Sequence, residues 1–355
     1  MGMFKDMLKS NESIFRDSIP LDYDYQPKRI TSREKEQQQI VFSIKPLLQK
    51  RNGRNLIITG KPGLGKTVVC RHILSDIEDE TDEIIPIYIN CWKKNTSYKI
   101  ANEICNLIGY KFTQNKRTDE LLNVIIKELN KESVVFVFDE IDKVEDFDFM
   151  YSFLEEIYRK TFILITNYKE WIINLDERIK SRLTPETMEF TQYNASQIKD
   201  ILSERKKYAF VEGVWDENAF DKIIEETTEL GDVRKGLFFM RESGNTAEDK
   251  SSKNITTEHV EEALKKIQEF SVANKEELDP ENKFILDVIK DNSGKKIGEL
   301  FKTYEEKGGK GNYKAFQRRI KKLEDNKFIT TEKISGGAEG KTTIINFQQK
   351  TLSDF

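Results

Sequence analysis

A chain of 355 residues, 37% of them hydrophobic and 34% charged, is long enough for two or three folded domains, and no apolar run approaches the 18 residues of a membrane span. The cysteines (Cys70, Cys91 and Cys105) form no CxxC pair and the two histidines stand apart, which argues against a zinc site, a disulfide framework and a histidine-based triad. The net charge of −4 conceals a basic segment: residues 280–349 hold 15 Lys and Arg against 10 Asp and Glu, which favours either a polyanionic partner or simply a lysine-rich surface.

The N-terminal residues give no sign of export. They lack the apolar middle section of a secretory signal. We therefore expect a cytoplasmic protein with reduced structural thiols.

Four short apolar runs define the first half of the chain, at residues 55–60, 84–90, 133–140 and 162–167. Amphipathic helical patterns separate them. Runs without polar alternation are typical of strands buried on both faces, and their alternation with helices predicts an α/β fold with a parallel sheet. We expect this domain to cover residues 1–191, including an N-terminal segment at 1–32.

Helical patterns dominate the second half. Four are predicted near 194–209, 216–230, 232–243 and 256–270, with a polar loop at 243–254. They would form a helical domain over residues 192–272, and residues 271–280 have the composition of a linker. Three further helices (281–292, 296–306, 312–326) and two strands flanking 335–341 predict a third domain at 280–349.

The stretch GKPGLGKT at 60–67 follows a predicted strand, precedes a helix and matches the pattern G-x-x-x-x-G-K-[ST]. Its glycines allow backbone N–H groups to surround phosphate oxygens at a helix N-terminus. Lys66 would reach the β- and γ-phosphates of ATP, or the β-phosphate of ADP, and the Thr67 hydroxyl would bind Mg²⁺. The residues expected around the nucleotide are Pro62, Gly63, Leu64, Gly65, Lys66, Thr67 and Val68.

Two carboxylates end the strand in VVFVFDEID at 134–142. Ligands of open α/β sheets bind at the carboxyl ends of the strands, so Asp139 is suited to the Mg²⁺ shell and Glu140 to activating a water for attack on the γ-phosphate. An acidic strand end can also be a solvated turn. Asp142 is predicted to be a helix cap.

The next strand ends at Asn167, whose amide could orient the attacking water or simply begin a turn. Farther on, Arg178 and Arg182 are four residues apart and should share one helix face. Either could act on the nucleotide of a neighbouring protomer, with Arg182 the preferred candidate. The alternative is a surface salt bridge.

The order of these elements resembles Walker A, Walker B, sensor 1, arginine finger and sensor 2 of an AAA+ ATPase. GDVRKGL at 231–237 is similar to the sensor 2 box of the archaeal origin recognition and cell-division-control initiator family. Residues 24–34 resemble its N-terminal nucleotide-side box, which makes Tyr25 and Arg33 candidate nucleotide contacts. Residues 88–100 resemble the segment after its second strand. The likeness spans about residues 15–347.

This resemblance implies that Arg234 reaches over the phosphates from the helical domain and senses the γ-phosphate. A planar guanidinium suits phosphate oxygens. The chain departs from the family pattern at Val233 and Gly236, which replace alanines, and at Ser97, which replaces proline. A glycine inside a helix costs about 1 kcal/mol relative to alanine. Because of Gly236 we therefore expect the helical domain at 192–272, the lid of the family, to be less rigid.

Residues 280–349 resemble a winged helix. In the helix predicted at 312–326, Phe316, Ile320 and Leu323 fall within about 60° of arc and, with Phe328, suggest the packed side. The cations are expected on the opposite side or its flanks, where they would contact DNA or only solvent. They are Lys314, Arg318, Lys321, Arg319 and Lys322.

Two further sets of lysines are candidates for DNA contacts. Lys341 would contact DNA from the wing, although Glu339 beside it is unfavourable near phosphates. Lys93, Lys94 and Lys99 occupy the place of a further DNA contact in the family, or are ordinary surface lysines.

The leading hypothesis is an ATP-dependent DNA-binding replication initiator that recognises origins and helps to load the replicative helicase, with slow hydrolysis acting as a switch. Its partners would be origin DNA, the helicase and homo- or hetero-oligomers with paralogues; no membrane partner is expected. It would lie at the nucleoid. The alternatives are a DNA-binding regulator of transcription or mobile elements, and an interaction protein that keeps ADP permanently.

Overall fold

The computed structural model describes residues 13–276, 280–309, 311–325, 328–334 and 342–347. The chain divides into two compact units, residues 1–257 and residues 258–355.

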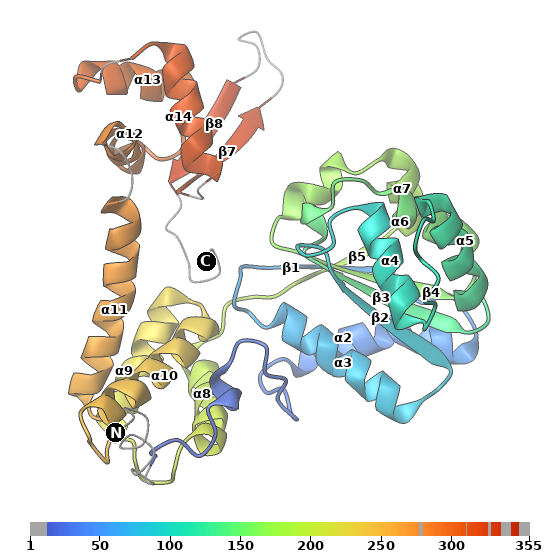
Figure 1. Cartoon of the computed structure of the whole chain (residues 1–355), viewed down its shortest axis with the longest axis horizontal. Helices are drawn as coiled ribbons and strands as arrows, with labels where there is room; N and C mark the ends of the chain where they lie inside the picture. The colour runs from blue at the N-terminus through green and yellow to red at the C-terminus, as the bar shows by residue number, and fades with distance from the viewer. Residues whose placement is uncertain (1–12, 277–279, 310, 326–327, 335–341, 348–355) are drawn as a thin grey trace. The chain divides into compact units, whose positions relative to one another are not determined.

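Unit 1 contains a five-stranded parallel sheet in the order β2-β3-β4-β1-β5 (Figure 1). The strands are β1 (Leu56–Thr59), β2 (Ile84–Asn90), β3 (Ser133–Asp139), β4 (Lys160–Thr166) and β5 (Glu186–Glu189). The first four strands confirm the prediction that the four apolar runs are strands. The sequence did not predict β5, because this edge strand buries only Met188 and has no apolar run.

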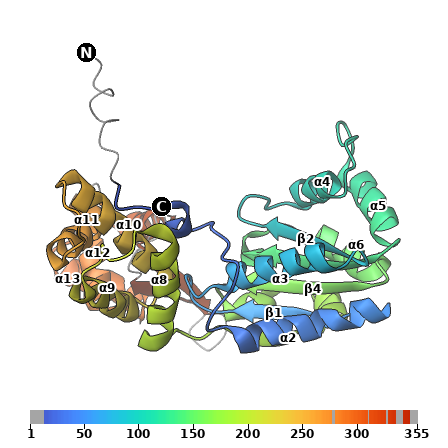
Figure 2. The ribbon, with the colours of Figure 1, turned by 90° about the horizontal axis from the view of Figure 1, so that it is seen from below.

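Helices cover both faces of the sheet. All seven residues of β3 are buried, and their side chains alternate: Val135 and Val137 face one cluster of the core, and Phe136 and Phe138 face the other. The valine side is covered by α2 (Glu34–Ile44) and α3 (Lys66–Glu80), as Figure 2 shows. The phenylalanine side is covered by α4 (Ser97–Leu107), α5 (Thr118–Leu129), α6 (Asp148–Glu156) and α7 (Glu177–Leu183). The short 3₁₀ helices are η1 (Ile19–Leu21), η2 (Lys45–Gln49), η3 (Ile141–Lys143) and η4 (Lys169–Asn174).

A lid of three helices completes unit 1: α8 (Ala195–Ala209), α9 (Glu217–Leu230) and α10 (Val233–Asp249). The polar loop predicted at 243–254 is wrong for its first seven residues, which belong to α10. Ser243, Gly244, Thr246 and Ala247 are buried there. Gly244 lies against the ring of Phe15, so small side chains in this turn make room for the N-terminal segment.

Unit 2 begins within α11 (Thr257–Glu276). This helix extends over the first six residues of the predicted linker at 271–280. The prediction was wrong there because no glycine or proline occurs before Pro280 to end the helix.

The rest of unit 2 contains α12 (Pro280–Asp291), α13 (Ile297–Glu306) and α14 (Tyr313–Asp325), close to the three predicted helices. A small antiparallel sheet has the order β6-β8-β7, formed by β6 (Lys295–Lys296), β7 (Ile329–Ile334) and β8 (Thr342–Phe347). Phe316, Ile320, Leu323 and Phe328 are all buried in its core, which confirms the packed side predicted for α14.

Candidate nucleotide site

The loop between β1 and α3 has the backbone that its glycines permit. Gly63 has φ of 79° and Gly65 has φ of 84°, in the left-handed region that other residues rarely adopt. Helix α3 begins at Lys66, directly after this loop. The unpaired N–H groups of a helix N-terminus therefore adjoin a tightly curved loop, an arrangement that binds anions.

Lys66 joins the loop to the end of β4. Its Nζ donates hydrogen bonds to Gly60 O (2.6 Å), Lys61 O (2.9 Å) and Asn167 Oδ1 (2.9 Å). Burial lowers the pKa of Lys66 to about 8; Asp139 acts in the opposite direction, and Arg234 lowers the pKa further. Folding thus brings together Lys66 and Asn167, 101 residues apart.

A second pair of predicted residues meets beside them. The Thr67 hydroxyl donates to Asp139 Oδ2 at 2.6 Å, and Asp139 is only 3% exposed. A hydroxyl beside a buried carboxylate is an oxygen donor set suited to Mg²⁺, which retains waters and shares phosphate ligands. Within the described ranges no group of three His, Cys, Asp or Glu side chains could hold a metal ion by itself. The Thr67 and Asp139 oxygens, together with waters and phosphate oxygens, fit the shell of a Mg²⁺ that arrives with a nucleotide.

Glu140 follows Asp139 with a positive φ of 54°. A left-handed glutamate costs about 1–2 kcal/mol, and such strain persists where the surroundings impose it, often at functional sites. The prediction that Asp142 caps a helix is wrong, because Glu140 occupies the N-cap position of η3. Asp142 instead accepts a hydrogen bond from Thr166 Oγ1 (2.8 Å) and pairs with Lys143 Nζ (2.9 Å).

The lid contacts the loop through the start of α10. Asp232 caps this helix by accepting from Arg234 N (3.0 Å), and its carboxylate also binds the Arg234 guanidinium at 3.1 and 3.2 Å. The Asp232 side chain lies against Gly63, where a Cβ would be 1.9 Å from Oδ1. Arg234 is close enough to Lys66 to lower the pKa of its ammonium.

Arg33 is 3% exposed and engaged within the fold. It binds Glu36 (2.7 Å) and Thr191 O (2.6 Å), and its guanidinium lies 4.0 Å from the ring centroid of Tyr193. Tyr193 in turn donates to Leu64 O of the loop at 3.1 Å. Arg33 thus supports the loop through Tyr193.

Tyr25 lies under a lid residue that sequence reasoning missed. The guanidinium of Arg205 is 4.6 Å from its ring centroid, and Arg205 is 8% exposed. Burial lowers the pKa of this arginine. No motif marks Arg205, since α8 shows only an ordinary amphipathic pattern.

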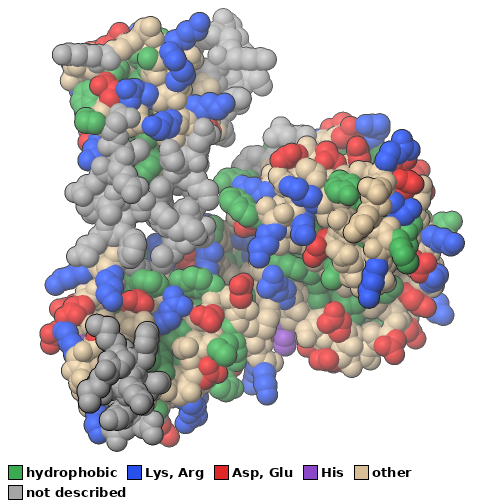
Figure 3. Space-filling view, viewed as in Figure 1, with side chains coloured by type: hydrophobic (Ala, Val, Ile, Leu, Met, Phe, Trp, Pro, Cys, Tyr) green, Lys and Arg blue, Asp and Glu red, His purple; other side chains and the backbone are tan. Residues whose placement is uncertain are grey.

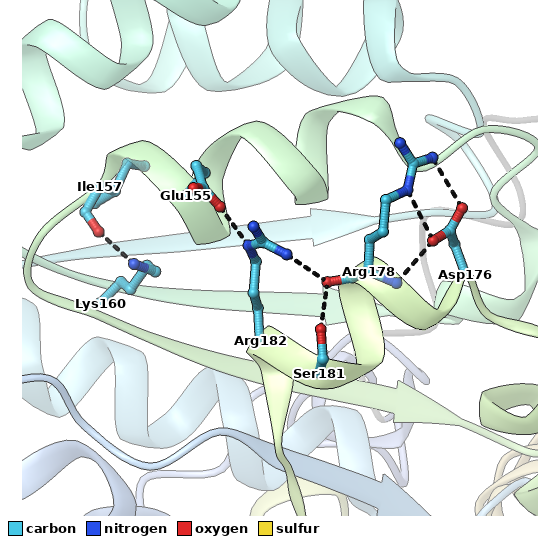
Figure 4. Close-up of polar contacts among 7 residues, drawn as sticks. All are labelled: Glu155, Ile157, Lys160, Asp176, Arg178, Ser181 and Arg182. Carbon is cyan, nitrogen blue, oxygen red and sulfur yellow. Dashed lines mark hydrogen bonds and ion pairs between the residues drawn. The ribbon is translucent and has the colours of Figure 1, made fainter.

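Arg178 and Arg182 share one helix face, as their spacing predicted. Their guanidinium carbons lie 5.5 and 5.0 Å from the ring centroid of Tyr151. Arg178 donates to the Asp176 carboxylate at 3.0 and 3.1 Å, and Arg182 pairs with Glu155. Figure 4 shows these two pairs. Hydrogen bonds from Arg178 lower the pKa of Asp176 to about 2. Both arginines therefore have partners within this chain.

The basic helix α14 presents Lys314, Arg318, Lys321 and Lys322 as exposed side chains. Figure 3 shows Lys and Arg side chains gathered on the visible face of this part of the chain. Arg319 differs, because it is half-buried and donates to the fully buried Asn282 at 3.0 Å. Lys341 and Glu339 lie outside the described residues.

The lysines of the loop before α4 and its first turn have mixed surroundings. Lys94 pairs with Glu103 (2.8 Å), Lys99 donates to Asn95 Oδ1 (2.8 Å), and Lys93 is exposed. Ser97, the departure from the family's proline, uses its N–H to bind Asp146 Oδ2 at 3.0 Å, which a proline could not do.

Comparison with known families and structures supports this interpretation of the fold. The model of an AAA domain matches residues 49–167, and the model of a Cdc6 AAA+ ATPase-type lid domain matches residues 199–265. Among the described residues, no helix is both long and apolar enough to cross a membrane.

Similar proteins extend over nearly the whole chain. The ORC1-type DNA replication protein 1 of Sulfolobus acidocaldarius is 31% identical, covering 94% of this chain and 90% of its own. That of Archaeoglobus fulgidus is 29% identical, covering 91% and 84%. The structure of the Aeropyrum pernix ORC1 protein in complex with DNA has a TM-score of 0.70 and 26% identity, covering 97% and 96%. The Cdc6p structure from Pyrobaculum aerophilum, with a TM-score of 0.65 and 21% identity over 95% and 96%, is a likeness of fold alone.

Proposed function

The chain belongs to the family of ORC1-type DNA replication proteins, and from this premise we propose that it is an ATP-dependent replication initiator that binds origin DNA and helps to load the replicative helicase. One observation supports ATP dependence most directly. The start of α10 in the lid contacts the phosphate loop, and Arg234 lies close to the Lys66 ammonium. A nucleotide phosphate bound between Arg234 of the lid and Lys66 of the sheet domain would draw these two parts of unit 1 together.

Each side chain of the site has a proposed role. Lys66 would bind the β- and γ-phosphates, while Thr67 and Asp139 would hold a Mg²⁺, which would supply charge neutralisation of the phosphates. Glu140 polarises the attacking water and Asn167 orients it. Arg234 senses the γ-phosphate, and Arg182 or Arg178 would reach a neighbouring protomer only after leaving Glu155 or Asp176.

Hydrolysis is proposed to be slow and to act as a switch. Glu140→Gln should abolish turnover while ATP still binds, because the amide cannot accept a proton from water. Glu212→Gln, an exposed glutamate of the lid, is the matched control and should leave turnover unchanged. The purified protein could instead retain ADP and show no measurable ATP turnover, so that Lys66→Ala has no turnover to remove. That result would identify an interaction protein.

DNA binding is proposed for the winged helix because of the exposed cations of α14 and the relative that was solved in complex with DNA. Helicase and paralogue partners, and a place at the nucleoid, follow from the initiator role. Footprinting on DNA of the organism's own genome, with ATP and with ADP, tests the proposal. Protection at replication start points supports it, whereas protection at promoters or mobile-element ends identifies a regulator.

A further inference from the structure

Asp139 has a second hydrogen-bond donor besides Thr67. The phenolic hydroxyl of Tyr88, on the neighbouring strand β2, donates to Asp139 Oδ2 at 2.8 Å. Thr67 donates to this same oxygen at 2.6 Å. Two hydroxyls on one carboxylate oxygen fix the direction of the whole group.

Tyr88 is itself held in place from α3. The Arg71 guanidinium lies 4.3 Å from the centroid of its ring. Arg71 follows Thr67 by four residues, so both side chains project from the same side of α3. One helix thus supplies both a direct donor to Asp139 and the cation that covers the second donor.

The direction of this hydrogen bond follows from the chemistry of the two groups. An ionised carboxylate can only accept, so the Tyr88 hydroxyl is the donor.

We propose that Tyr88, covered by Arg71, is a positioning residue that holds the Asp139 carboxylate ready for the metal ion of a metal–nucleotide complex. This inference rests on the proposed nucleotide site. If the Thr67 oxygen were engaged by a metal ion, the Tyr88 hydroxyl would still hold the Asp139 carboxylate in its present orientation. Without the Tyr88 hydroxyl, the Asp139 carboxylate would have to be oriented when the metal–nucleotide complex binds.

The test is the Mg²⁺ dependence of nucleotide binding by Tyr88→Phe, which keeps the ring beneath Arg71 and removes only the hydroxyl. Fluorescent ADP is titrated in EDTA and then at increasing Mg²⁺ concentrations. We expect the Mg²⁺ midpoint to rise about tenfold, the lower end of the effect of removing an outer-shell partner, while affinity in EDTA changes less than twofold. Tyr158→Phe, which removes a hydroxyl from an exposed ring elsewhere in unit 1, is the matched control and should change neither value.

The outcomes separate the two levels of the proposal. If the wild-type protein binds no nucleotide, the proposed function fails. If it binds Mg²⁺–ADP normally and Tyr88→Phe has an unchanged midpoint, only the role of Tyr88 is refuted. Equal losses with and without Mg²⁺, together with a lower melting temperature, would show a purely structural tyrosine and also refute it.

Discussion

The carboxylate of Asp232 lies so close to Gly63 that a Cβ on this glycine would be 1.9 Å from Asp232 Oδ1. The lid therefore contacts the phosphate loop at a position that has no side chain. Gly63 also has a positive φ of 79°. Both the close approach of Asp232 and the backbone conformation require a glycine at position 63, and their energetic contributions can be measured separately.

Gly63→Ala should destabilise the nucleotide-free protein through both backbone strain and the clash with Asp232. Asp232→Ser shortens the clashing side chain while keeping a good N-cap. Unfolding in urea should therefore show that the double variant loses less than the sum of the single variants, by about 0.5–3 kcal/mol. Gly65→Ala is the control, because Gly65 has a similar φ but faces Tyr193. Its effect should add to that of Asp232→Ser; equal coupling for both glycines would contradict a specific contact.

Gly236 makes the helices of the lid approach closely and does not merely weaken α10. A Cβ there would lie 2.6 Å from Thr227 Oγ1 and 3.1 Å from Leu202 Cδ1. Gly236→Ala gains about 1 kcal/mol of helix propensity, but overpacking costs about 1–3 kcal/mol, so we expect a net loss of stability in thermal unfolding.

The same substitution should become stabilising in a Thr227→Ala background, where the nearest clash is gone. Gly298→Ala is the control, because a Cβ on this glycine of α13 would have no neighbour within 4 Å among the described residues and should only add helix propensity. Stabilisation by Gly236→Ala alone would favour the looser lid expected from sequence.

Nucleotide affinity should depend on pH through Lys66. Its pKa is lowered to about 8 in the folded protein from 10.5, so above pH 8 the free protein loses the charge that binds phosphate. We expect the affinity for ATP to be level below pH 8 and to fall above it, by up to tenfold per pH unit, because binding must then take up a proton. Lys66→Ala should remove the fall in affinity above pH 8. Lys61→Ala, which replaces an exposed lysine of the same loop, should retain it.

The stability of the nucleotide-free protein should respond in the opposite direction. Between pH 8 and 10.5 the unfolded chain holds a proton on Lys66 that the folded protein has released. The contribution of Lys66 to the free energy of unfolding therefore rises with pH in this window. Urea unfolding of the wild type and Lys66→Ala at several pH values measures the difference; a parallel pH dependence would contradict the lowered pKa.

Duplex DNA binding should depend on the outward cations of α14. Lys314→Ala with Arg318→Ala should weaken binding and reduce the slope of log affinity against log salt by about two, as expected for two lost phosphate contacts. Lys290→Ala with Lys302→Ala removes two exposed lysines of α12 and α13 and should leave the slope unchanged. Equal effects of both pairs would indicate only net charge.

Arg319 should act on stability instead. Its guanidinium donates to the side-chain oxygen of the fully buried Asn282, and loss of a hydrogen bond to a buried polar group costs about 1–3 kcal/mol. We expect Arg319→Ala to lower the melting temperature of the protein, whereas Arg318→Ala, an exposed neighbour, should leave it unchanged. Weaker DNA binding by folded Arg319→Ala without loss of stability would support a direct DNA contact.

The parts of the fold that were predictable have strong local signals. Four strands were visible as apolar runs, and the loop at 60–67 as glycines at a strand end. The edge strand β5 and the last turns of α10 were missed, because β5 buries one residue and the helix turn at 243–247 contains small residues that are explained only by Phe15. Local pattern cannot reveal a neighbour more than 200 residues away.

The same division holds in the site. The sequence by itself determined that Lys66 and Thr67 begin the helix after the glycine loop and that Asp139 and Asn167 lie at strand ends, because each of these boundaries has its own local signal. Only the tertiary structure decided that Asp232 rests on Gly63, that Tyr88 binds Asp139, and that Arg33 and Arg319 are engaged inside the fold. The reason is physical: composition and periodicity specify which face of an element is buried, whereas a hydrogen bond between two side chains depends on where two separate elements come to lie.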